Sequence, residues 1–425
     1  MISYHQALQA LLAHAQRLAH EPCSLGESLG RVLAQDVASP MALPSFDHAA
    51  MDGYALCAHE PLLAGSEHDV SGSQAAGDAA RASSGRAWEI MTGARLPDGL
   101  DAVVAVERTQ LLATAEDGTP KRIRLLDPLA VGANVRYAGS DVAMGATVVH
   151  AGTRIEPAQV MLLAALGVTR VSVVRQPRVA IICTGKELQA DPTRPLAAEC
   201  IHNSNGPYLL AALSAAGTRV VSCDTVDDTA HTYARAVARA RDAGVDLIIS
   251  TGAVSMGRYD FVPDTLGELG AELLFHKVAI RPGKPLLAAS LRDGPLVMAL
   301  PGTPMAVAAG FRFFITPLLR ALAGQGGELT RYALLDTPQQ PKPGLRHFLR
   351  ARLQQAPDGR LHASLLRQQQ PFRIQPFAQA DAWVVLPEDA GDGAAGTLVE
   401  IASLQPDQPF TMAAHCGADH QDMSP

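Results

Sequence analysis

Three loops rich in glycine, proline and hydroxyl side chains, each preceded by an apolar run, constrain the fold of this chain most strongly. They occupy residues 250–257, 281–285 and 301–304. A parallel or mixed α/β sheet can bring all three loops to one edge, beyond the carboxyl ends of its strands, where ligands bind. Glycine lets backbone N–H groups approach a phosphate, and Arg281 or Lys284 can neutralise its charge. The loops therefore predict a phosphorylated or nucleotide-like ligand.

Strand and helix patterns alternate between residue 177 and about residue 324. Apolar runs at 178–183, 219–226 and 245–250 predict strands, and helical periodicity at 207–216 and 230–243 predicts helices. Such alternation is typical of βαβ units with right-handed crossovers. We therefore expect an α/β domain in this part of the chain.

The flanking segments have other patterns. Helical spacing at residues 3–19 and 160–166 predicts two helices. Between about 41 and 139, short segments punctuated by glycine, proline, aspartate and serine suit a small β-domain. The apolar pieces between about 330 and 403 predict a small β-barrel or sandwich.

Composition and charge exclude several classes of protein. The 425 residues are 48% hydrophobic and 18% charged, which is enough to bury the cores of two to four globular domains. A net charge of -7 argues against a general nucleic-acid binder. The six cysteines are scattered without a C-x-x-C pair, which favours reduced thiols in a cytosolic protein. Because no leader pattern and no apolar run of the ~18 residues of a membrane span is recognisable, we expect a cytoplasmic protein without a membrane partner.

Five motifs occur in order along the chain, at residues 44–55, 90–94, 250–257, 281–285 and 300–304. In these motifs the chain resembles the MoeA family, the molybdopterin molybdenumtransferases related to the E domain of gephyrin. The resemblance covers about residues 1–403. Five motifs in order are far more specific than one glycine-rich loop.

The resemblance implies an enzyme of molybdenum-cofactor biosynthesis. Family members take adenylylated molybdopterin and molybdate as substrates, cleave the adenylate in a divalent-metal-dependent step with release of AMP, and leave molybdenum on the dithiolene sulfurs. They are elongated homodimers, with the active site between the α/β domain of one subunit and the N-terminal β-domain of the other. Mg²⁺ is the implied cofactor, and the adenylyltransferase of the same pathway is a further candidate partner.

The predicted fold is multidomain α/β, with a central βαβ molybdopterin-binding-like domain, an N-terminal helical and β region, a small β-domain and a C-terminal β-barrel-like domain. The predicted boundaries are 1–42 with 140–176 for an elongated linker domain, 43–139 for the inserted β-domain, 177–325 for the α/β domain, 326–403 for the C-terminal β-domain, and 404–425 for a disordered tail.

Ligand chemistry narrows the candidate residues. A carboxylate about 4 Å from a phosphate charge costs about 4 kcal/mol at an effective dielectric near 20, so acidic residues at such a site need a bridging cation. Mg²⁺ suits that role, because carboxylates, water and phosphate oxygens all ligate it. The candidate metal ligands are Glu187, Asp227, Asp228 and Asp260. The candidate catalytic residues are Asp52, Asp141, Lys277 and Lys284. The candidate substrate-binding residues are Thr92, Thr251, Gly252, Ser255, Arg281, Gly283, Pro301, Gly302 and Thr303.

Every acidic candidate except Asp141 also has a purely structural interpretation. Asp227 or Asp228 can cap the helix that follows them, and Asp260 can cap the next one. Asp52 can form a turn, and Glu187 can be a solvated residue.

Four residues depart from the family pattern. Lys186, Ala253, Thr303 and Ala306 stand where the family usually has Asp, Gly, Asn and Ser. Two alternatives to the enzyme therefore stay open. One is a catalytically weakened paralogue that acts as a molybdopterin-binding or scaffold protein, and the other is a molybdopterin adenylyltransferase.

Overall fold

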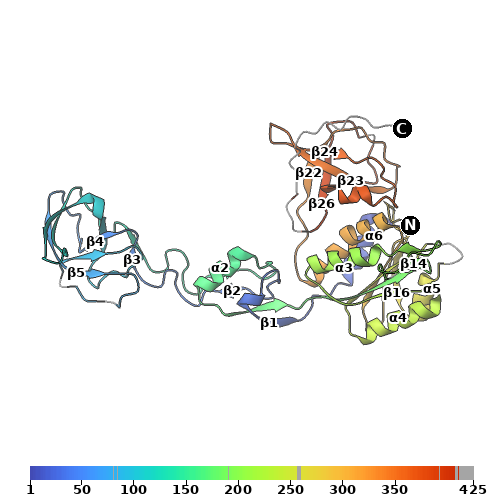
Figure 1. The fold of residues 1–425 in the computed structure, drawn as a ribbon, viewed down its shortest axis with the longest axis horizontal. Coiled ribbons are helices and arrows are strands. Elements are labelled where there is room, and N and C mark those ends of the chain that lie inside the picture. Colours follow the sequence, from blue (N-terminus) through green and yellow to red (C-terminus); the bar gives the residue numbers. More distant parts are fainter. Residues whose placement is uncertain are drawn as a thin grey trace. The chain divides into compact units, whose positions relative to one another are not determined.

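The computed structural model describes residues 1–79, 81–83, 85–189, 191–255, 260–391, 393–406 and 410. Met256 and Gly257 of the first loop, and most of the expected tail at 404–425, lie outside the described residues. The chain divides into two compact units (Figure 1). The first unit comprises Met1–Glu21, Gly30–Ala34 and Val173–Pro425, and the second comprises Pro22–Leu29 and Gln35–Ser172. Strands β1 (His20–Ser24) and β12 (Arg170–Val174) lie where the chain passes from one unit to the other.

The second unit contains a six-stranded sheet in the order β7-β4-β6-β5-β9-β8. Its strands are β4 (Gly53–Leu56), β5 (Glu67–Gln74), β6 (Ala87–Ile90), β7 (Ala102–Ala105), β8 (Thr109–Thr114) and β9 (Pro120–Leu125). Side chains alternate across the sheet, so Tyr54 and Leu56 join one apolar cluster while Ala55 joins another with Trp88. The expected β-domain is therefore a sheet with apolar residues on both faces.

Shorter elements complete the second unit. The strand pairs are β3 (His48–Ala49) with β10 (Val135–Arg136), and β2 (Val37–Ala38) with β11 (Thr147–Val149). The helical pieces are α2 (Pro157–Ala165) and the 3₁₀ turns η1 (Leu25–Glu27) and η2 (Val106–Arg108).

The first unit contains a six-stranded mixed sheet in the order β16-β13-β17-β21-β20-β18. Its strands are β13 (Arg178–Thr184), β16 (Arg219–Val226), β17 (Leu247–Thr251), β18 (Glu272–His276), β20 (Leu287–Ser290) and β21 (Leu296–Leu300). β13, β16, β17 and β21 run parallel, whereas β20 runs antiparallel to β21. Because Leu287 at the start of β20 lies opposite Ala299 near the end of β21, the amino end of β20 shares an edge with the carboxyl ends of the parallel strands.

Helices bury both faces of this sheet, which explains why its central strands are nearly continuous apolar runs. Ile181 faces a cluster with residues of α1 (Tyr4–Ala13) and α3 (Asn205–Ala215). The next residue, Ile182, faces a cluster with residues of α4 (Ala230–Asp242) and α5 (Val262–Glu268). Two short strands, β14 (Leu188–Gln189) and β15 (Ile201–His202), pair beside the sheet.

One long apolar helical stretch follows β21. It consists of α6 (Pro304–Gly310), a π-helical segment η3 (Phe311–Ile315) and α7 (Thr316–Leu322). By length and composition its 19 residues meet the criteria for a membrane span, contrary to the expectation from sequence. However, 83% of an 18-residue window of this stretch is buried inside the protein, as in the core helix of a globular domain.

The C-terminal part of the first unit is a closed β-barrel. Its strands are β22 (Arg331–Leu335), β23 (Arg346–Gln355), β24 (Leu361–Leu365), β25 (Ala382–Leu386) and β26 (Leu398–Ser403), with a short helix α8 (Gln375–Ala378) before β25. β23 pairs with both β24 and β25, and this closes the ring of five strands. The short strand β19 (Ile280–Arg281) pairs with β23, so the loop before β20 is joined to the barrel. Of the two expected architectures, the barrel is confirmed.

The expected α/β elements are confirmed to within a few residues, and two details differ. The first helix ends at Ala13, well before the expected residue 19. Neither Asp227 nor Asp228 caps α4, because Thr229 occupies the N-cap and its side chain accepts a hydrogen bond from the Thr232 N–H.

Candidate active site

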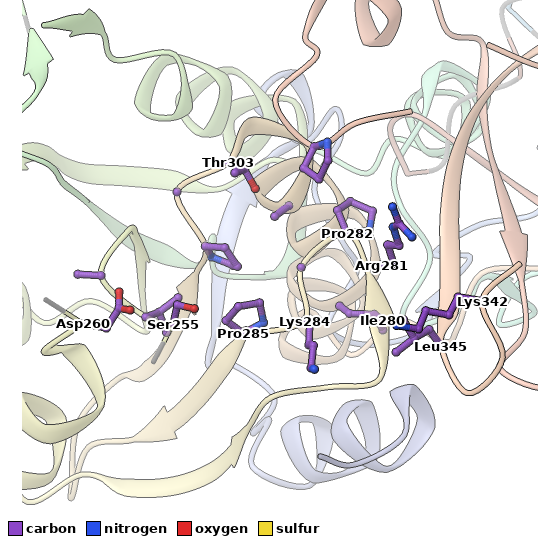
Figure 2. A pocket seen from close by; sticks show the side chains of 17 residues that line it. Ser255, Asp260, Ile280, Arg281, Pro282, Lys284, Pro285, Thr303, Lys342 and Leu345 are labelled. Atoms are coloured by element: carbon purple, nitrogen blue, oxygen red, sulfur yellow. The ribbon is translucent and has the colours of Figure 1, made fainter. Parts of the chain in front are cut away.

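The sheet edge of the first unit brings the three loops around one pocket of about 580 Å³ (Figure 2). Two loops follow β17 and β21, and the third precedes β20. The pocket is lined by Ala253, Val254, Ser255, Asp260, Ile280, Arg281, Pro282, Gly283, Lys284, Pro285, Pro301, Gly302, Thr303, Ala306, Lys342, Leu345 and Pro371. The expected convergence of the loops is confirmed.

Gly252 cannot carry a side chain at the end of β17. Its φ is +94°, and a Cβ would lie 2.5 Å from Thr184 Oγ1 and 2.7 Å from the Thr184 carbonyl oxygen. The Thr184 hydroxyl itself donates a hydrogen bond of 3.1 Å to the Thr251 carbonyl oxygen. Close packing and this hydrogen bond therefore hold the carboxyl ends of β13 and β17 together next to the pocket.

The next residue, Ala253, has a φ of +49°, a left-handed conformation that glycine adopts more easily. The Val254 carbonyl oxygen lies 3.0 Å from His276 Nε2 at the end of β18, so this loop is tied to a second strand. The chain thus keeps the loop geometry although the glycine typical of the family pattern is replaced.

The loop that carries Arg281 and Lys284 is fixed by its own backbone. The Lys284 carbonyl oxygen accepts a hydrogen bond from the Val278 N–H at 2.9 Å, and the Gly283 carbonyl oxygen accepts one from the Leu286 N–H at 2.9 Å. Gly283 has a φ of +103°. This arrangement leaves both cationic side chains exposed at the pocket.

The loop after β21 is held by α3. Asn205, the first residue of that helix, donates its side-chain N–H to the Gly302 carbonyl oxygen at 2.8 Å. A Cβ on Gly302 would lie in ordinary contact with the Gly252 Cα, at 3.6 Å, so the two loops are neighbours here. Thr303 then occupies the N-cap of α6, with no hydrogen bond from its side chain to the helix.

The charge of the pocket favours an anion. Arg281, Lys284 and Lys342 line it, and Asp260 is the one carboxylate among its described lining residues. Figure 2 shows Asp260 and Ser255 on the side of the pocket opposite Arg281 and Lys342. Such a pocket can hold the oxygens of an anionic ligand at its cationic side.

The predicted substrate-binding residues of the first unit mostly come together. Ser255, Arg281, Gly283, Pro301, Gly302 and Thr303 line the pocket. Thr251 is buried at the end of β17, and Gly252 supports the loop from below. Of the predicted catalytic lysines, Lys284 lines the pocket, whereas Lys277, which precedes β19, is absent from its described lining.

The predicted metal ligands are more dispersed. Asp260 lines the pocket and precedes α5, whose N-cap is Phe261. Glu187, Asp227 and Asp228 are exposed residues after β13 and β16 and do not belong to the described lining. The Asp228 carboxylate accepts a hydrogen bond of 3.3 Å from the Lys186 N–H.

Three predicted residues lie in the second unit. The Asp52 carboxylate accepts hydrogen bonds from the N–H and the hydroxyl of Thr92, at 2.6 and 2.7 Å. These bonds hold the pKa of Asp52 below its ordinary value. Asp141 is exposed, and its backbone N–H donates to the Leu43 carbonyl oxygen.

The side chains of the pocket suit a metal ion whose ligands come partly from the protein and partly from a substrate. Among the described residues, no three His, Cys, Asp or Glu side chains form a group that could hold a metal ion. Mg²⁺ does not require such a group, because one or two carboxylates, water and phosphate oxygens can complete its coordination. Asp260 is a carboxylate in the pocket that fits this role.

The sequence-based prediction misses the contribution of the barrel. Lys342, Leu345 and Pro371 line the pocket, and the Pro371 carbonyl oxygen accepts a hydrogen bond from the Met305 N–H in the first turn of α6. No motif marks these residues. The parallel pairing of β19 with β23 brings Lys342 and Leu345 to the site, and the hydrogen bond from Met305 holds Pro371 there.

The fold and the pocket define an α/β protein with a cation-lined pocket at the carboxyl edge of its sheet and a β-barrel beside that pocket. Family models match residues 2–167 (MoeA N-terminal region, domains I and II), 180–321 (probable molybdopterin binding domain) and 332–404 (MoeA C-terminal region, domain IV). The chain belongs to the MoeA family.

Relatives and solved structures match over nearly the full length. Proteins named molybdopterin molybdenumtransferase from Synechococcus elongatus and Bacillus subtilis are 35% and 33% identical to this chain. The matches cover 95% and 90% of this chain, and 100% and 89% of the relatives. A crystal structure of a MoeA protein from Pyrococcus horikoshii has a TM-score of 0.79 at 27% identity, and the match covers 95% of this chain and all of that one.

Proposed function

We propose that this protein is a molybdopterin molybdenumtransferase, which inserts molybdate into adenylylated molybdopterin with release of AMP. The observation that carries the proposal is the full-length similarity to relatives of that name, together with a cationic pocket at the matched sheet edge. The pathway is molybdenum-cofactor biosynthesis, and the proposed location is the cytoplasm.

The residues of the pocket suit two anionic substrates. Arg281 and Lys284 bind phosphate or molybdate oxygens, and the glycine-rich loops let backbone N–H groups approach them. Asp260 would otherwise repel these oxygens, so it is the residue that would hold Mg²⁺ if the metal binds together with the substrate. A bound Mg²⁺ would neutralise charge on the phosphates of the adenylylated substrate. Glu187, Asp227 or Asp228 are further candidate ligands from the neighbouring strands.

A turnover assay tests the proposal. Purified protein is incubated with adenylylated molybdopterin, molybdate and Mg²⁺, and AMP release and molybdenum retention are measured. We expect both for the natural protein, and a loss of at least about tenfold in kcat/KM for Lys284→Met, since one charge-assisted contact to an anion is worth about 1.5–3 kcal/mol. Lys121→Met, an exposed change on β9 of the second unit, is the matched control.

The same assay separates the alternatives. Tight binding of adenylylated molybdopterin without AMP release would indicate the scaffold, which the replacements Ala253, Thr303 and Ala306 in the pocket favour. ATP-dependent adenylylation of free molybdopterin would indicate the adenylyltransferase.

We further propose a homodimer in which Asp52, Thr92 and Asp141 of one subunit complete the pocket of the other. Mixing two impaired variants, Lys284→Met and Asp52→Asn, tests this assignment. Subunit exchange should restore part of the activity, because each mixed dimer contains one intact site. Activity that does not rise after exchange, or full activity in a strictly monomeric preparation, contradicts the shared site.

A further inference from the structure

The loop 342–345 of the barrel places a third cation in the pocket. Lys342 is exposed and lines the pocket together with Arg281 and Lys284. Figure 2 shows Lys342 and Leu345 on the side of the pocket where Ile280 and Arg281 lie. Two segments far apart in the sequence, the α/β loop and the barrel loop, thus both contribute cations to the pocket.

A buried histidine ties the barrel loop to the α/β loop. His347, the second residue of β23, is 6% exposed, and its Nε2 lies 3.3 Å from the Lys342 carbonyl oxygen. In the strand pairing, His347 is the direct partner of Arg281. Burial is the main cause that lowers the pKa of His347; the hydrogen bond to the Lys342 carbonyl oxygen opposes this, and the charge of Arg281 adds to it. Because a carbonyl oxygen only accepts hydrogen bonds, the His347 Nε2–H is the donor. The His347 side chain therefore helps to hold the backbone of Lys342 in place relative to Arg281.

A second cationic side chain of the barrel, that of Arg350, makes its hydrogen bonds within the barrel and its loops. Arg350 is 1% exposed, and its guanidinium donates hydrogen bonds to Gln369 Oε1 and to the carbonyl oxygens of Gln368 and Arg373. Its charge holds the loop that leads to Pro371, which lines the pocket. Lys342, by contrast, reaches the pocket with its side chain exposed.

We infer that Lys342 binds the anionic oxygens of the substrate, and that His347 is a positioning residue for Lys342. This inference rests on the proposed function for the identity of the substrate. The ligand chemistry is an oxygen-rich anion, which can be free molybdate or the phosphate of the adenylylated substrate.

Direct binding measurements distinguish the two sources. Molybdate alone and AMP alone are titrated calorimetrically into the full-length protein and into Lys342→Met. We expect the affinity for one of them to fall about tenfold, equivalent to about 1.4 kcal/mol, and the ligand that is affected identifies the source. Lys121→Met should bind both as the natural protein does. Equal affinities of Lys342→Met and the natural protein for both ligands, or no binding of either by the natural protein, would overturn the inference.

The role of His347 requires a variant series. His347→Leu should weaken binding of the same ligand, and His347→Gln, which keeps an N–H donor, should restore it. In the double variant Lys342→Met/His347→Leu, the second change should have no further effect. Equal losses from His347→Leu with and without Lys342 would show that the histidine acts only through general structure. Thermal unfolding of each variant shows that the fold is retained.

Turnover measurements distinguish a failure of this inference from a failure of the proposed function. If the natural protein releases no AMP, the proposed function fails while the binding result still stands. If the natural protein turns over and Lys342→Met has an unchanged KM for adenylylated molybdopterin and for molybdate, the inference fails and the proposed function stands.

Discussion

Ala253 carries a side chain in a conformation that is costly for any residue with a Cβ. Its φ of +49° falls in the left-handed region, where non-glycine residues are less stable by about 1–2 kcal/mol. Ala253→Gly removes that cost but gives the unfolded chain more freedom, worth about 0.5–1 kcal/mol. We expect a net stabilisation of up to about 1 kcal/mol, measured by urea unfolding. Gly252→Ala is the opposite control, because its Cβ would overlap Thr184. A destabilised Ala253→Gly protein would show that the methyl group makes compensating contacts.

Asp52 has a pKa that depends on one neighbour. The Thr92 N–H and hydroxyl stabilise its charged form and lower its pKa from 3.8. A lowered folded-state pKa gives stability that is present above the unfolded-state value and is lost as the pH falls through the folded-state value. Thr92→Val removes the hydroxyl bond, so the pKa of Asp52 should rise toward 3.8. The carboxylate should then contribute less stability, and that contribution should be fully lost at a higher pH than in the natural protein.

A carboxyl-detected NMR titration measures this change. Asp191, whose pKa is lowered by Thr193 in the same way, is the internal control and should not change. An Asp52 pKa that is the same in both proteins would mean that the backbone N–H alone sets it.

For individual residues, the sequence predicts those that lie in motifs and misses those that reach the site only through contacts in the folded chain. Ser255, Arg281 and Gly302 are predictable because a loop pattern marks them, and they line the pocket. Lys342 and His347 lie far along the chain from Arg281, in a segment without a motif. Only strand pairing, which depends on the whole barrel, brings them together.

Among the elements, the π-helical segment η3 depends on a buried charge. Arg312 is 5% exposed, and it contacts Glu328 through two hydrogen bonds of 2.7 and 3.1 Å and the Ser403 carbonyl oxygen at 2.8 Å. Glu328→Ala leaves this guanidinium without its counter-charge, and we expect a loss of about 3 kcal/mol in the free energy of unfolding. Chemical denaturation measures the loss.

An exposed pair is the matched control for this prediction. Arg108 and Asp127 are 2.8 Å apart with both side chains more than half exposed, so Asp127→Ala should cost less than about 1 kcal/mol. Adding Arg312→Met to Glu328→Ala should recover part of the stability, because no charge then stays buried. Similar losses from Glu328→Ala and Asp127→Ala would contradict this account.

The elements themselves are more predictable than their ends. The alternating apolar runs of β13, β16 and β17 determine both the strand type and the buried position, and the structure confirms them. Helix ends depend on local competition between side chains. Thr229 caps α4 although two aspartates precede it, and the sequence offers no signal that ranks the three.

At the scale of the whole first unit, the α/β sheet and the barrel share one apolar core. Phe313 of η3 stacks on Phe348 of β23 with ring centroids 3.8 Å apart, and Trp383 of β25 lies 5.9 Å from Phe313. We therefore expect the two parts to unfold together. Hydrogen exchange followed by mass spectrometry should give the same opening free energy for β17 and β24, and a barrel that exchanges well before the sheet would contradict this expectation.

The domain boundary expected between residues 325 and 326 stays a prediction. The shared core affects how such a boundary should be interpreted. A boundary drawn from sequence marks where one pattern ends and another begins. It does not show whether two segments are independent in solution, because that depends on contacts such as the Phe313–Phe348 stack.

The barrel wall of the pocket has a consequence for how relatives of this chain diverge. Lys342, Leu345 and Pro371 line the same pocket as the glycine-rich loops. Substitutions in this downstream segment, which carries no recognisable motif, can therefore change the selectivity for one oxyanion over another. Two homologues with identical loops can then prefer different metals, and grafting residues 342–371 from one to the other would transfer that preference.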